Sequence, residues 1–307
     1  MQEIISNTIE RICADVPGDR VLINEPMSRH TSFRIGGPAA AFVTVSNEEE
    51  LAAVLSAVTA TGAEHMIIGN GSNLLVSDEG YPGIMIKLGG DFESIVRDEK
   101  DPCRVKVGAA MLMSRTSAFL TENGLSGFEF ASGIPGSIGG AVFMNAGAYG
   151  GEIRDVAVSA RHMDYSGISG SFLGEELSFG YRKSAYSGKK LIVTEAKFLL
   201  EKGDHGEISR RMEDILERRR SKQPLEFPSA GSVFKRPTGY YAGALIEAAG
   251  LKGASVGAAQ VSEKHAGFII NRGGASCADV CALIEKIQKA VFEKDGVFLE
   301  PEIRRMP

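Results

Sequence analysis

The chain has 307 residues and a formal net charge of −5, with 34 Lys and Arg against 39 Asp and Glu. Its 37 glycines are accompanied by only 11 prolines, so the glycine excess indicates tight turns in a folded protein, not a collagen-like or disordered chain. The acidic balance disfavours binding to nucleic acid or to an anionic membrane. No stretch reaches the ~20 apolar residues that span a bilayer, and the length favours more than one domain.

The N-terminal segment, residues 1–15, mixes charged and apolar side chains and lacks the basic start and apolar run of a signal peptide. We therefore expect a cytoplasmic protein. The four cysteines include no CxxC pair, and neither they nor the five histidines have the spacing of a metal site, so we expect no metal. Cys277 and Cys281 lie four residues apart in an apolar helical pattern and are expected to pack inside the protein.

Strand-like and helical patterns alternate over the first 200 or so residues. Asn47, with Glu50 three residues later, predicts the start of a helix that Gly62 ends. Beyond it we expect strands at Met66–Ile68, Ile84–Leu88, Cys103–Val107 and Leu191–Leu200, a helix at Leu112–Asn123, and a hairpin of Val156–Tyr165 with Ile168–Leu173. The strands are too irregularly spaced for one parallel sheet, so the sequence predicts an α+β fold.

Glycine and charge interrupt the pattern at Lys202–Gly206, where we expect a domain boundary. Helices are predicted at Glu207–Lys222 and from Ser276 to Gly296, followed by an extended run over Val297–Arg304. The basic residues at 218–222 have two interpretations: they bind a phosphate, or they end a helix whose dipole favours cations there.

Two clusters hold many of the glycines. One is Gly69–Asn73, directly after an expected strand, and the other runs from Gly133 to Gly151. Glycine lets backbone N–H groups approach a phosphate closely because no Cβ is in the way. The first cluster is not a Rossmann fingerprint, since Leu74 stands at the third glycine position, and the chain has no P-loop motif. Two clusters about 60 residues apart fit a bound pyrophosphate better than two unrelated turns.

In order and spacing, the motifs of the chain resemble those of the UDP-N-acetylenolpyruvoylglucosamine reductases, the MurB family of flavoenzymes in peptidoglycan precursor synthesis. The long glycine segment and the run Ala-Gly-Ser-Val-Phe-Lys are the specific motifs. The resemblance runs nearly end to end, through Thr31–Gly37, Gly69–Leu75, Gly133–Gly151, Tyr181–Ser184, Ala230–Lys235, Val261–His265 and Leu299–Glu302.

This resemblance implies an α+β fold with an FAD-binding domain of the vanillyl-alcohol-oxidase (PCMH) type over residues 1–203, in two subdomains split near 90–100. A smaller α+β substrate-binding domain, residues 204–307, would follow, with its C-terminal strand returning to the active site. The FAD would be non-covalent. Its implied contacts are Gly69, Asn70, Gly71, Ser72, Asn73, Ile134, Pro135, Gly136, Ser137, Gly139, Gly140, Asn145 and Ala146.

The implied activity is the reduction of UDP-N-acetylglucosamine enolpyruvate to UDP-N-acetylmuramate. NADPH would reduce the flavin, and hydride would then pass from N5 to the enolpyruvyl double bond. This oxidoreductase step belongs to cell-wall biogenesis, and so to cell shape, the cell cycle and cell division. The partners would be the UDP-sugar and NADPH; the oligomeric state is left open, and a monomer is compatible with the sequence.

Three residues match the catalytic residues of the family: Arg182, Ser232 and Glu302. Hydride addition builds an enolate-like negative charge, which a permanent cation with a planar donor fork, such as Arg182, can stabilise. Ser232 matches the proton donor, and a hydroxyl must be close and aligned because it is a poor acid. Glu300 and Glu302 could face the same way on an extended run; the residue pattern alone leaves both open, and the family pattern selects Glu302.

Lys235 is a candidate for assisting the donor or binding phosphate. Two departures from the family concern the substrate: Arg236 stands where many members have Asn, and Ala244 where many have Lys. We find no insertion carrying the substrate-capping tyrosine of one branch, so the chain fits the shorter branch. This leaves Arg236, Tyr240 and Tyr241 as candidates to replace that tyrosine.

Two other functions compete with this interpretation. An FAD-dependent oxidase of the same fold would use oxygen, and such enzymes often tether the flavin through His or Cys. A flavin-binding protein without turnover would explain the glycine clusters. It would give no reason for Arg182, Ser232 and Glu302 to stand in the family's register.

Overall fold

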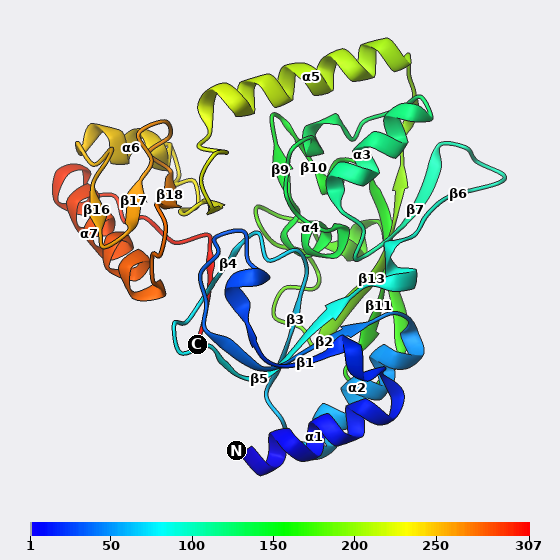
Figure 1. Ribbon diagram of the computed structural model, residues 1–307. Coiled ribbons are helices and arrows are strands. Elements are labelled where there is room, and N and C mark those ends of the chain that lie inside the picture. Colours follow the sequence, from blue (N-terminus) through cyan, green and yellow to red (C-terminus); the bar gives the residue numbers. More distant parts are fainter. Residues whose placement is uncertain (1) are drawn as a thin grey trace. The chain divides into compact units, whose positions relative to one another are not determined.

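The computed structural model describes residues 2–307 and divides into two compact units (Figure 1). The first comprises the chain up to Ile23, Ala41–Asn70 and Gly83–Glu217; the second comprises Asn24–Ala40, Gly71–Pro82 and Arg218–Pro307. The chain passes from one unit to the other at several points, and three of these points lie within strands β1 (Val21–Pro26), β2 (Pro38–Val45) and β5 (Tyr81–Leu88). These units are defined by the contacts within each of them. The predicted domains, 1–203 for FAD and 204–307 for substrate, are defined by the molecule that each would bind, and the division into those two domains stays a prediction.

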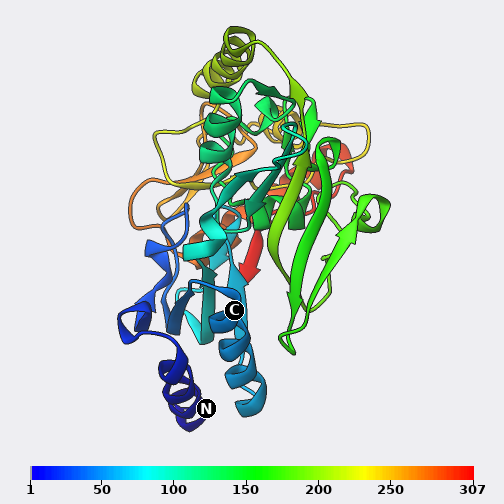
Figure 2. The ribbon, with the colours of Figure 1, turned by 90° about the vertical axis from the view of Figure 1, so that its right-hand side faces the viewer.

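A five-stranded antiparallel sheet lies in the first unit, and its green strands run next to one another in Figure 2. Its order is β12 (Ser169–Leu173), β11 (Ala157–Asp164), β13 (Leu191–Leu199), β7 (Arg104–Gly108) and β6 (Ile95–Arg97). The predicted hairpin is confirmed, because β11 and β12 pair from Ser159–Leu173 to Met163–Ser169. The buried core of this unit includes Val105, Val107 and Phe198 from the sheet.

A second sheet has the order β1-β2-β5-β3, in which β3 (His65–Ile68) runs parallel to β5. Helices α1 (Gln2–Asp15) and α2 (Glu48–Thr61) pack side by side in the first unit (Figures 1 and 2). Helix α2 begins as predicted, since the Asn47 side chain accepts a hydrogen bond from the Glu50 N–H at 2.8 Å. Gly62, with φ +70°, ends it in the left-handed conformation.

The second unit is built on a four-stranded sheet with α6 (Ala242–Ala248) and α7 (Cys277–Asp295). The strand order is β15 (Ser229–Ser232), β18 (Phe268–Asn271), β17 (Ala259–Val261) and β16 (Ser255–Val256). Helix α7 packs on β16, β17 and α6 (Figure 1). Its predicted start is confirmed, because Ser276 and Asp279 form a reciprocal capping box, and Gly296 ends the helix.

The end of the chain differs from the predicted run Val297–Arg304, since a strand forms only at β19 (Arg304–Met306), parallel to β4 (Leu74–Val76). Before it, Pro301 makes an isolated bridge with Phe234. Proline lacks an N–H group, so it cannot continue a ladder of hydrogen bonds there. The remaining elements are α3 (Met113–Glu122), α4 (Ile138–Met144), α5 (His205–Lys222), β8 (Leu125–Ser126), β9 (Gly147–Ala148), β10 (Gly151–Glu152) and β14 (Glu201–Lys202).

Candidate active site

The two glycine clusters meet in the first unit. Gly69 follows β3, and a Cβ atom at this position would overlap the Ser137 hydroxyl. The Asn70 side-chain amide donates to the Pro135 carbonyl at 2.6 Å. Segments about 65 residues apart in the sequence are therefore in contact, as a shared cofactor site requires.

Gly71 is in the left-handed conformation with φ +63°, and a Cβ there would overlap the His30 carbonyl oxygen. The Ser32 N–H also donates to the Gly71 carbonyl at 3.2 Å. Only glycine fits this position, and the turn it makes fixes the path of the loop toward Asn73.

Helix α4 lies inside the second cluster and contains two consecutive glycines. A Cβ on Gly139 would lie 3.0 Å from the Ala109 Cβ, so packing explains this glycine. Gly140 is exposed, and a Cβ there would meet only the Ser137 Oγ, at 3.7 Å. Glycine inside a helix costs about 0.5–1 kcal/mol relative to alanine. Among the described residues, no close contact at position 140 requires glycine. An uncovered backbone beside the glycine cluster fits the close approach of a cofactor such as FAD.

Asn145, predicted to contact the cofactor, has its side chain committed to the protein. The residue is fully buried with φ +44°, and its amide nitrogen donates to the Gly180 carbonyl at 3.1 Å and to Glu152 Oε2 at 3.0 Å. Its Oδ1 accepts from the Arg154 N–H at 3.0 Å. A cofactor contact from Asn145 is therefore left to its backbone, and the same prediction for Ala146 is untested.

Arg182 lies at the tip of a tight turn. Gly180 and Lys183 exchange backbone hydrogen bonds of 3.0 and 3.2 Å, and Arg182 between them has φ +53°. Its guanidinium donates to the Gly147 carbonyl at 3.5 Å and lies 5.2 Å from the centroid of the Tyr181 ring. An arginine held in the left-handed region is uncommon, and such strained residues cluster at functional sites.

Ser232 is the last residue of β15, next to an irregularity in the pairing of β15 with β18. Gly231, with φ +77°, precedes it, and such bulges change the direction in which the next side chain points. The serine is exposed, while Val233 beside it is buried. The predicted donor is thus on the surface of the second unit, carried by a rigid strand.

Residues 300–302 lie alongside residues 233–235 within the second unit. The Glu302 N–H donates to the Val233 carbonyl at 2.7 Å, and the Lys235 N–H donates to the Glu300 carbonyl at 2.8 Å. The Glu302 carbonyl accepts from the Asn73 side chain at 3.2 Å. Within the second unit, the structure therefore brings Glu302, the residue after Ser232 and Asn73 of the first glycine cluster together.

The two candidate glutamates differ in their surroundings. Glu300 is exposed, and its carboxylate forms an ion pair with the Lys235 ammonium group. Glu302 is only partly exposed. A half-buried carboxylate is a better acid–base candidate than an exposed one, because a reacting group must be held in place and shielded from water. The difference in exposure therefore favours Glu302, the residue that the family pattern selects.

The three candidate substrate contacts share one loop before α6. The Arg236 guanidinium lies 4.0 Å from the centroid of the Tyr241 ring, and Arg236 Nε donates to the Tyr240 carbonyl at 3.4 Å. Both tyrosines are exposed, Tyr241 by 64%. A cation on an exposed ring forms a flat face that can receive another planar group.

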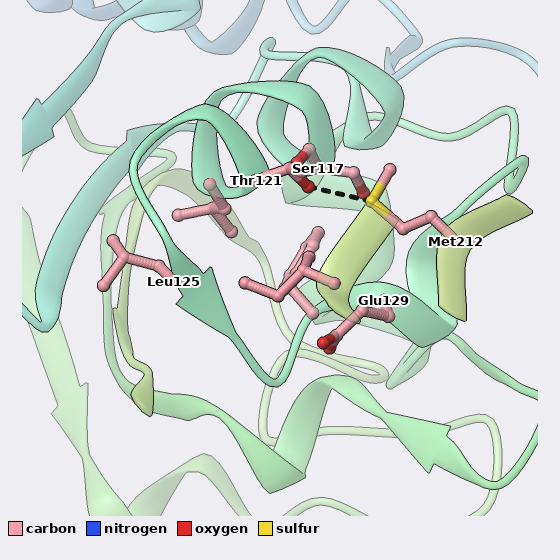
Figure 3. A pocket seen from close by; sticks show the side chains of 8 residues that line it. Ser117, Thr121, Leu125, Glu129 and Met212 are labelled. Atoms are coloured by element: carbon pink, nitrogen blue, oxygen red, sulfur yellow. Dashed lines mark hydrogen bonds between the residues drawn. The ribbon is translucent and has the colours of Figure 1, made fainter. Parts of the chain in front are cut away.

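A small pocket lies between α3 and α5 (Figure 3). Thr121 Oγ1 donates to the Met212 sulfur at 2.8 Å across it, and the space does not hold even one water molecule. It is lined by Ser117, Leu120, Thr121, Leu125, Phe128, Glu129, Ile208 and Met212. The side chains that line this pocket pack against one another between α3 and α5, and the pocket is not a ligand site.

A metal site within the described residues 2–307 would need several ligating side chains close together. No group of three His, Cys, Asp or Glu residues there could hold a metal ion. Burial, with the nearby Cys281 thiol, raises the pKa of Cys277 to about 12, so this thiol stays protonated and packs as predicted. In the same part of the chain, no helix has the length and apolarity to cross a membrane.

Residues 39–169 match the model of an FAD-binding domain family, and residues 223–306 match the C-terminal domain of UDP-N-acetylenolpyruvoylglucosamine reductases. A relative from Lachnoclostridium phytofermentans named UDP-N-acetylenolpyruvoylglucosamine reductase is 48% identical over 305 residues, 99% of this chain and 97% of the relative. The structure of the reductase from Thermus caldophilus is 38% identical, with a TM-score of 0.79, over 94% of this chain and 98% of that one.

A structure of p-cresol methylhydroxylase is also similar, with 16% identity and a TM-score of 0.50 over 66% of this chain and 44% of that one. At this identity the likeness concerns the fold alone. Together with the FAD-binding family match and the Thermus caldophilus structure, it confirms the expected α+β fold with an FAD-binding domain of the PCMH type.

Proposed function

The chain belongs to the UDP-N-acetylenolpyruvoylglucosamine reductase family, and from this premise we propose that it reduces UDP-N-acetylglucosamine enolpyruvate to UDP-N-acetylmuramate with FAD and NADPH. The proposal places this enzyme in the cytoplasmic steps of peptidoglycan synthesis. It assigns FAD binding to residues 1–203 and substrate binding to residues 204–307. A monomer is compatible with the sequence, and sedimentation of the purified protein would give the oligomeric state.

When bound, FAD supplies the redox chemistry, taking hydride from NADPH and passing it to the enolpyruvyl double bond. The glycine loops would hold the cofactor, with Gly69, Ser137 and Gly140 presenting backbone and hydroxyl groups where a phosphate can approach. Ser72, Asn73, Ile134 and Gly136 complete the two segments that we assign to it. We expect the flavin to be released on denaturation; flavin retained covalently would instead support an oxidase.

Arg182 is assigned to the substrate carboxylate. Hydride addition to the far carbon of the double bond conjugated with that carboxylate develops an enolate-like negative charge. A guanidinium that stays charged at all relevant pH values stabilises it. The strained turn presents the side chain from a backbone conformation that few arginines adopt. A fixed cation costs no reorganisation when the charge develops.

Ser232 is assigned to give its Oγ proton to the carbon next to the one that receives hydride, so that H⁻ and H⁺ add across the double bond. A free hydroxyl is a weak acid, and we assign Glu302 to the acid–base work beside it. The observation that carries this assignment is the pairing of residues 233–235 with 300–302, in which Glu302 N–H bonds to Val233 at 2.7 Å. Glu300 is exposed and forms an ion pair with Lys235, whereas Glu302 is half-buried beside Val233, the residue after Ser232.

Arg236, Tyr240 and Tyr241 are assigned to the UDP portion of the substrate. The flat face of Arg236 on Tyr241 suits a nucleotide, because the ring can stack on a base while the cation attracts phosphate. Lys235 adds a second cation to the same loop. This assignment would replace the capping tyrosine that the chain lacks.

Stopped-flow spectroscopy of the Ser232→Ala variant tests the proposal. NADPH should reduce the bound flavin at the wild-type rate, while reoxidation by the UDP-sugar should slow by at least about 100-fold, the usual contribution of a placed proton donor. If both half-reactions kept their wild-type rates, Ser232 would not be the donor. If wild-type reduced enzyme failed to react with the UDP-sugar at all, the proposed function itself would be wrong.

A further inference from the structure

The turn that carries Arg182 has a backbone conformation that is unfavourable for arginine unless other groups stabilise it. Arg182 has φ +53°, and the two backbone bonds between Gly180 and Lys183 close the turn tightly around it. A left-handed arginine costs free energy and persists only where neighbouring groups enforce it. The groups that enforce it can be identified within the first unit.

Two side-chain hydrogen bonds join the turn to the C-terminal end of α4. The Asn145 amide donates to the Gly180 carbonyl at 3.1 Å, at the start of the turn. The Ser184 hydroxyl donates to the Phe143 carbonyl at 2.9 Å, directly after the turn. The turn is therefore fastened on both sides of Arg182, and both attachments lead to residues within two positions of each other at the end of one helix.

The first attachment is itself rigid. Asn145 is fully buried, in a left-handed conformation that ends α4, and its amide also donates to Glu152 at 3.0 Å. The Arg154 N–H donates to Asn145 Oδ1 at 3.0 Å. With both N–H groups and the oxygen engaged, the amide has one orientation. Ser184 is buried as well, at 6% exposure.

The other end of α4 is fixed beside the glycine clusters. The Ile138 N–H donates to the Met111 carbonyl at 2.9 Å, and the Gly139 N–H donates to the Ala109 carbonyl at 2.8 Å. Ser137 just before the helix faces Gly69. Helix α4 therefore connects Gly69 and Ser137 at its start with the Arg182 turn at its end, over only seven residues.

We propose that Asn145 and Ser184 are positioning residues that hold the Arg182 guanidinium at a set place relative to the glycine clusters. The inference rests on the proposed function, in which Arg182 stabilises charge on the substrate while the glycine clusters hold the cofactor. Neither side chain touches a reacting atom in this arrangement. Both act through the backbone conformation of residues 180–184.

The test uses Ser184→Ala and Asn145→Gly, each alone and each combined with Arg182→Ala. Glycine tolerates the left-handed φ of residue 145, so this variant removes the amide without adding backbone strain. Ser187→Ala is the matched control, because its hydroxyl accepts from the Ser184 N–H at 3.1 Å but makes no bond to α4. Flavin reduction by NADPH and reoxidation by the UDP-sugar are followed anaerobically by stopped flow, and a thermal melt reports folding.

We expect each positioning variant to slow reoxidation by about 10–100-fold, as supporting residues of active sites do, and Ser187→Ala to change it less than about threefold. In the Arg182→Ala background the same two substitutions should slow reoxidation no further, because the group that they position is gone. A residue with a merely structural role would reduce the rate by the same factor in both backgrounds.

Equal factors in the two backgrounds, or wild-type reoxidation in both single variants, would overturn the inference while leaving the proposed function standing. If wild-type enzyme showed no reoxidation by the UDP-sugar, the proposed function would fall first. Should Asn145→Gly fail to fold, Ser184→Ala decides the question alone, since it removes one hydroxyl and leaves the Asn145 network complete.

Discussion

At the scale of single residues, several glycines and carboxylates of the site can be separated by what surrounds them. Gly71 and Gly139 are required by the packing of the chain on itself, whereas a Cβ at Gly140 would make only an ordinary contact, with Ser137 Oγ at 3.7 Å. Glu300 is exposed, and Glu302 is half-buried beside Val233. Gly140 and the two glutamates each lead to a variant with a matched control.

Replacing Gly140 by alanine should separate stability from cofactor binding. In the flavin-free protein we expect the variant to be as stable as wild type or more stable by about 0.5–1 kcal/mol, because alanine is the better helix residue. FAD affinity should fall at least about tenfold, or 1.4 kcal/mol, since the methyl group occupies the space assigned to the cofactor. Thermal melts and flavin fluorescence titration measure the two effects.

Gly18→Ala is the control for this variant, because Gly18 is also exposed with nothing within 4 Å of a Cβ. It should leave FAD affinity unchanged. Wild-type affinity in Gly140→Ala would show that the cofactor does not approach α4 at this residue.

The two glutamates give a second residue-scale prediction. Glu302→Gln should lower NADPH oxidation with the UDP-sugar by at least about 100-fold, because the amide cannot take part in proton transfer. Glu300→Gln should retain activity within about threefold, since it only weakens an exposed ion pair worth about 0–1 kcal/mol. Steady-state assays of both variants suffice, and the reverse order of effects would reject the assignment of Glu302.

At the scale of elements, the start of α7 shows how a distant segment is attached to a helix. Asp78, about 200 residues earlier in the sequence, accepts from the N–H groups of Cys277 at 2.6 Å and Ala278 at 3.0 Å. These N–H groups have no partner inside the helix, and a carboxylate there also interacts well with the helix dipole. The contact joins Gly71–Pro82 to the rest of the second unit.

Asp78→Ala should therefore destabilise the protein by about 1–2 kcal/mol, the usual cost of losing a helix cap. Urea unfolding followed by circular dichroism measures this loss. Glu79→Ala is the neighbouring control, because Glu79 is exposed and makes no contact with α7. Equal unfolding midpoints for wild type and Asp78→Ala would mean that water replaces the carboxylate at the helix start.

Helix ends were predictable from sequence wherever the signal is local. Asn47 with Gly62, and Ser276 with Gly296, mark α2 and α7 within a few residues. The contribution of Asp78 to the same helix start was not predictable, because nothing near Ser276 in the sequence points to residue 78. The same holds for the site: motif order identified Arg182, whereas the bonds from Asn145 and Ser184 depend on how α4 lies beside residues 180–184.

At the scale of the whole molecule, the packing units do not follow the order of the chain. The second unit takes Asn24–Ala40 and Gly71–Pro82 from the N-terminal part of the sequence, through contacts such as the Ser32 hydroxyl donating to the Ser229 carbonyl at 2.7 Å. A composition change at Lys202–Gly206 cannot reveal such returns, because it reports only on neighbours in sequence. Each unit also contains one histidine whose pKa is lowered by burial.

Burial lowers the pKa of His162 in the first unit and of His265 in the second. His162 is 8% exposed, and its Nδ1 lies 3.3 Å from the Tyr186 hydroxyl, which donates to the Ala160 carbonyl at 3.1 Å. The hydroxyl can then accept a hydrogen bond from Nδ1–H, an arrangement that a neutral imidazole satisfies. In His265, Nδ1 accepts from the Gly267 N–H at 3.1 Å, which a protonated ring could not do.

Because both folded-state pKa values lie below that of an unfolded histidine, near 6.5, the unfolded chain binds more protons as the pH falls. The stabilisation from these neutral rings is complete above about pH 6.5 and is lost as the pH falls below it.

Urea unfolding of the whole protein should therefore show a lower midpoint at pH 5.5 than at pH 7.5, a window above the range where most carboxylates titrate. His162→Gln should reduce this difference, and His30→Gln, at a histidine paired with Glu25, serves as the control. An unchanged difference in His162→Gln would mean that other groups set the pH dependence, since glutamine can keep a polar contact to Tyr186 but cannot titrate.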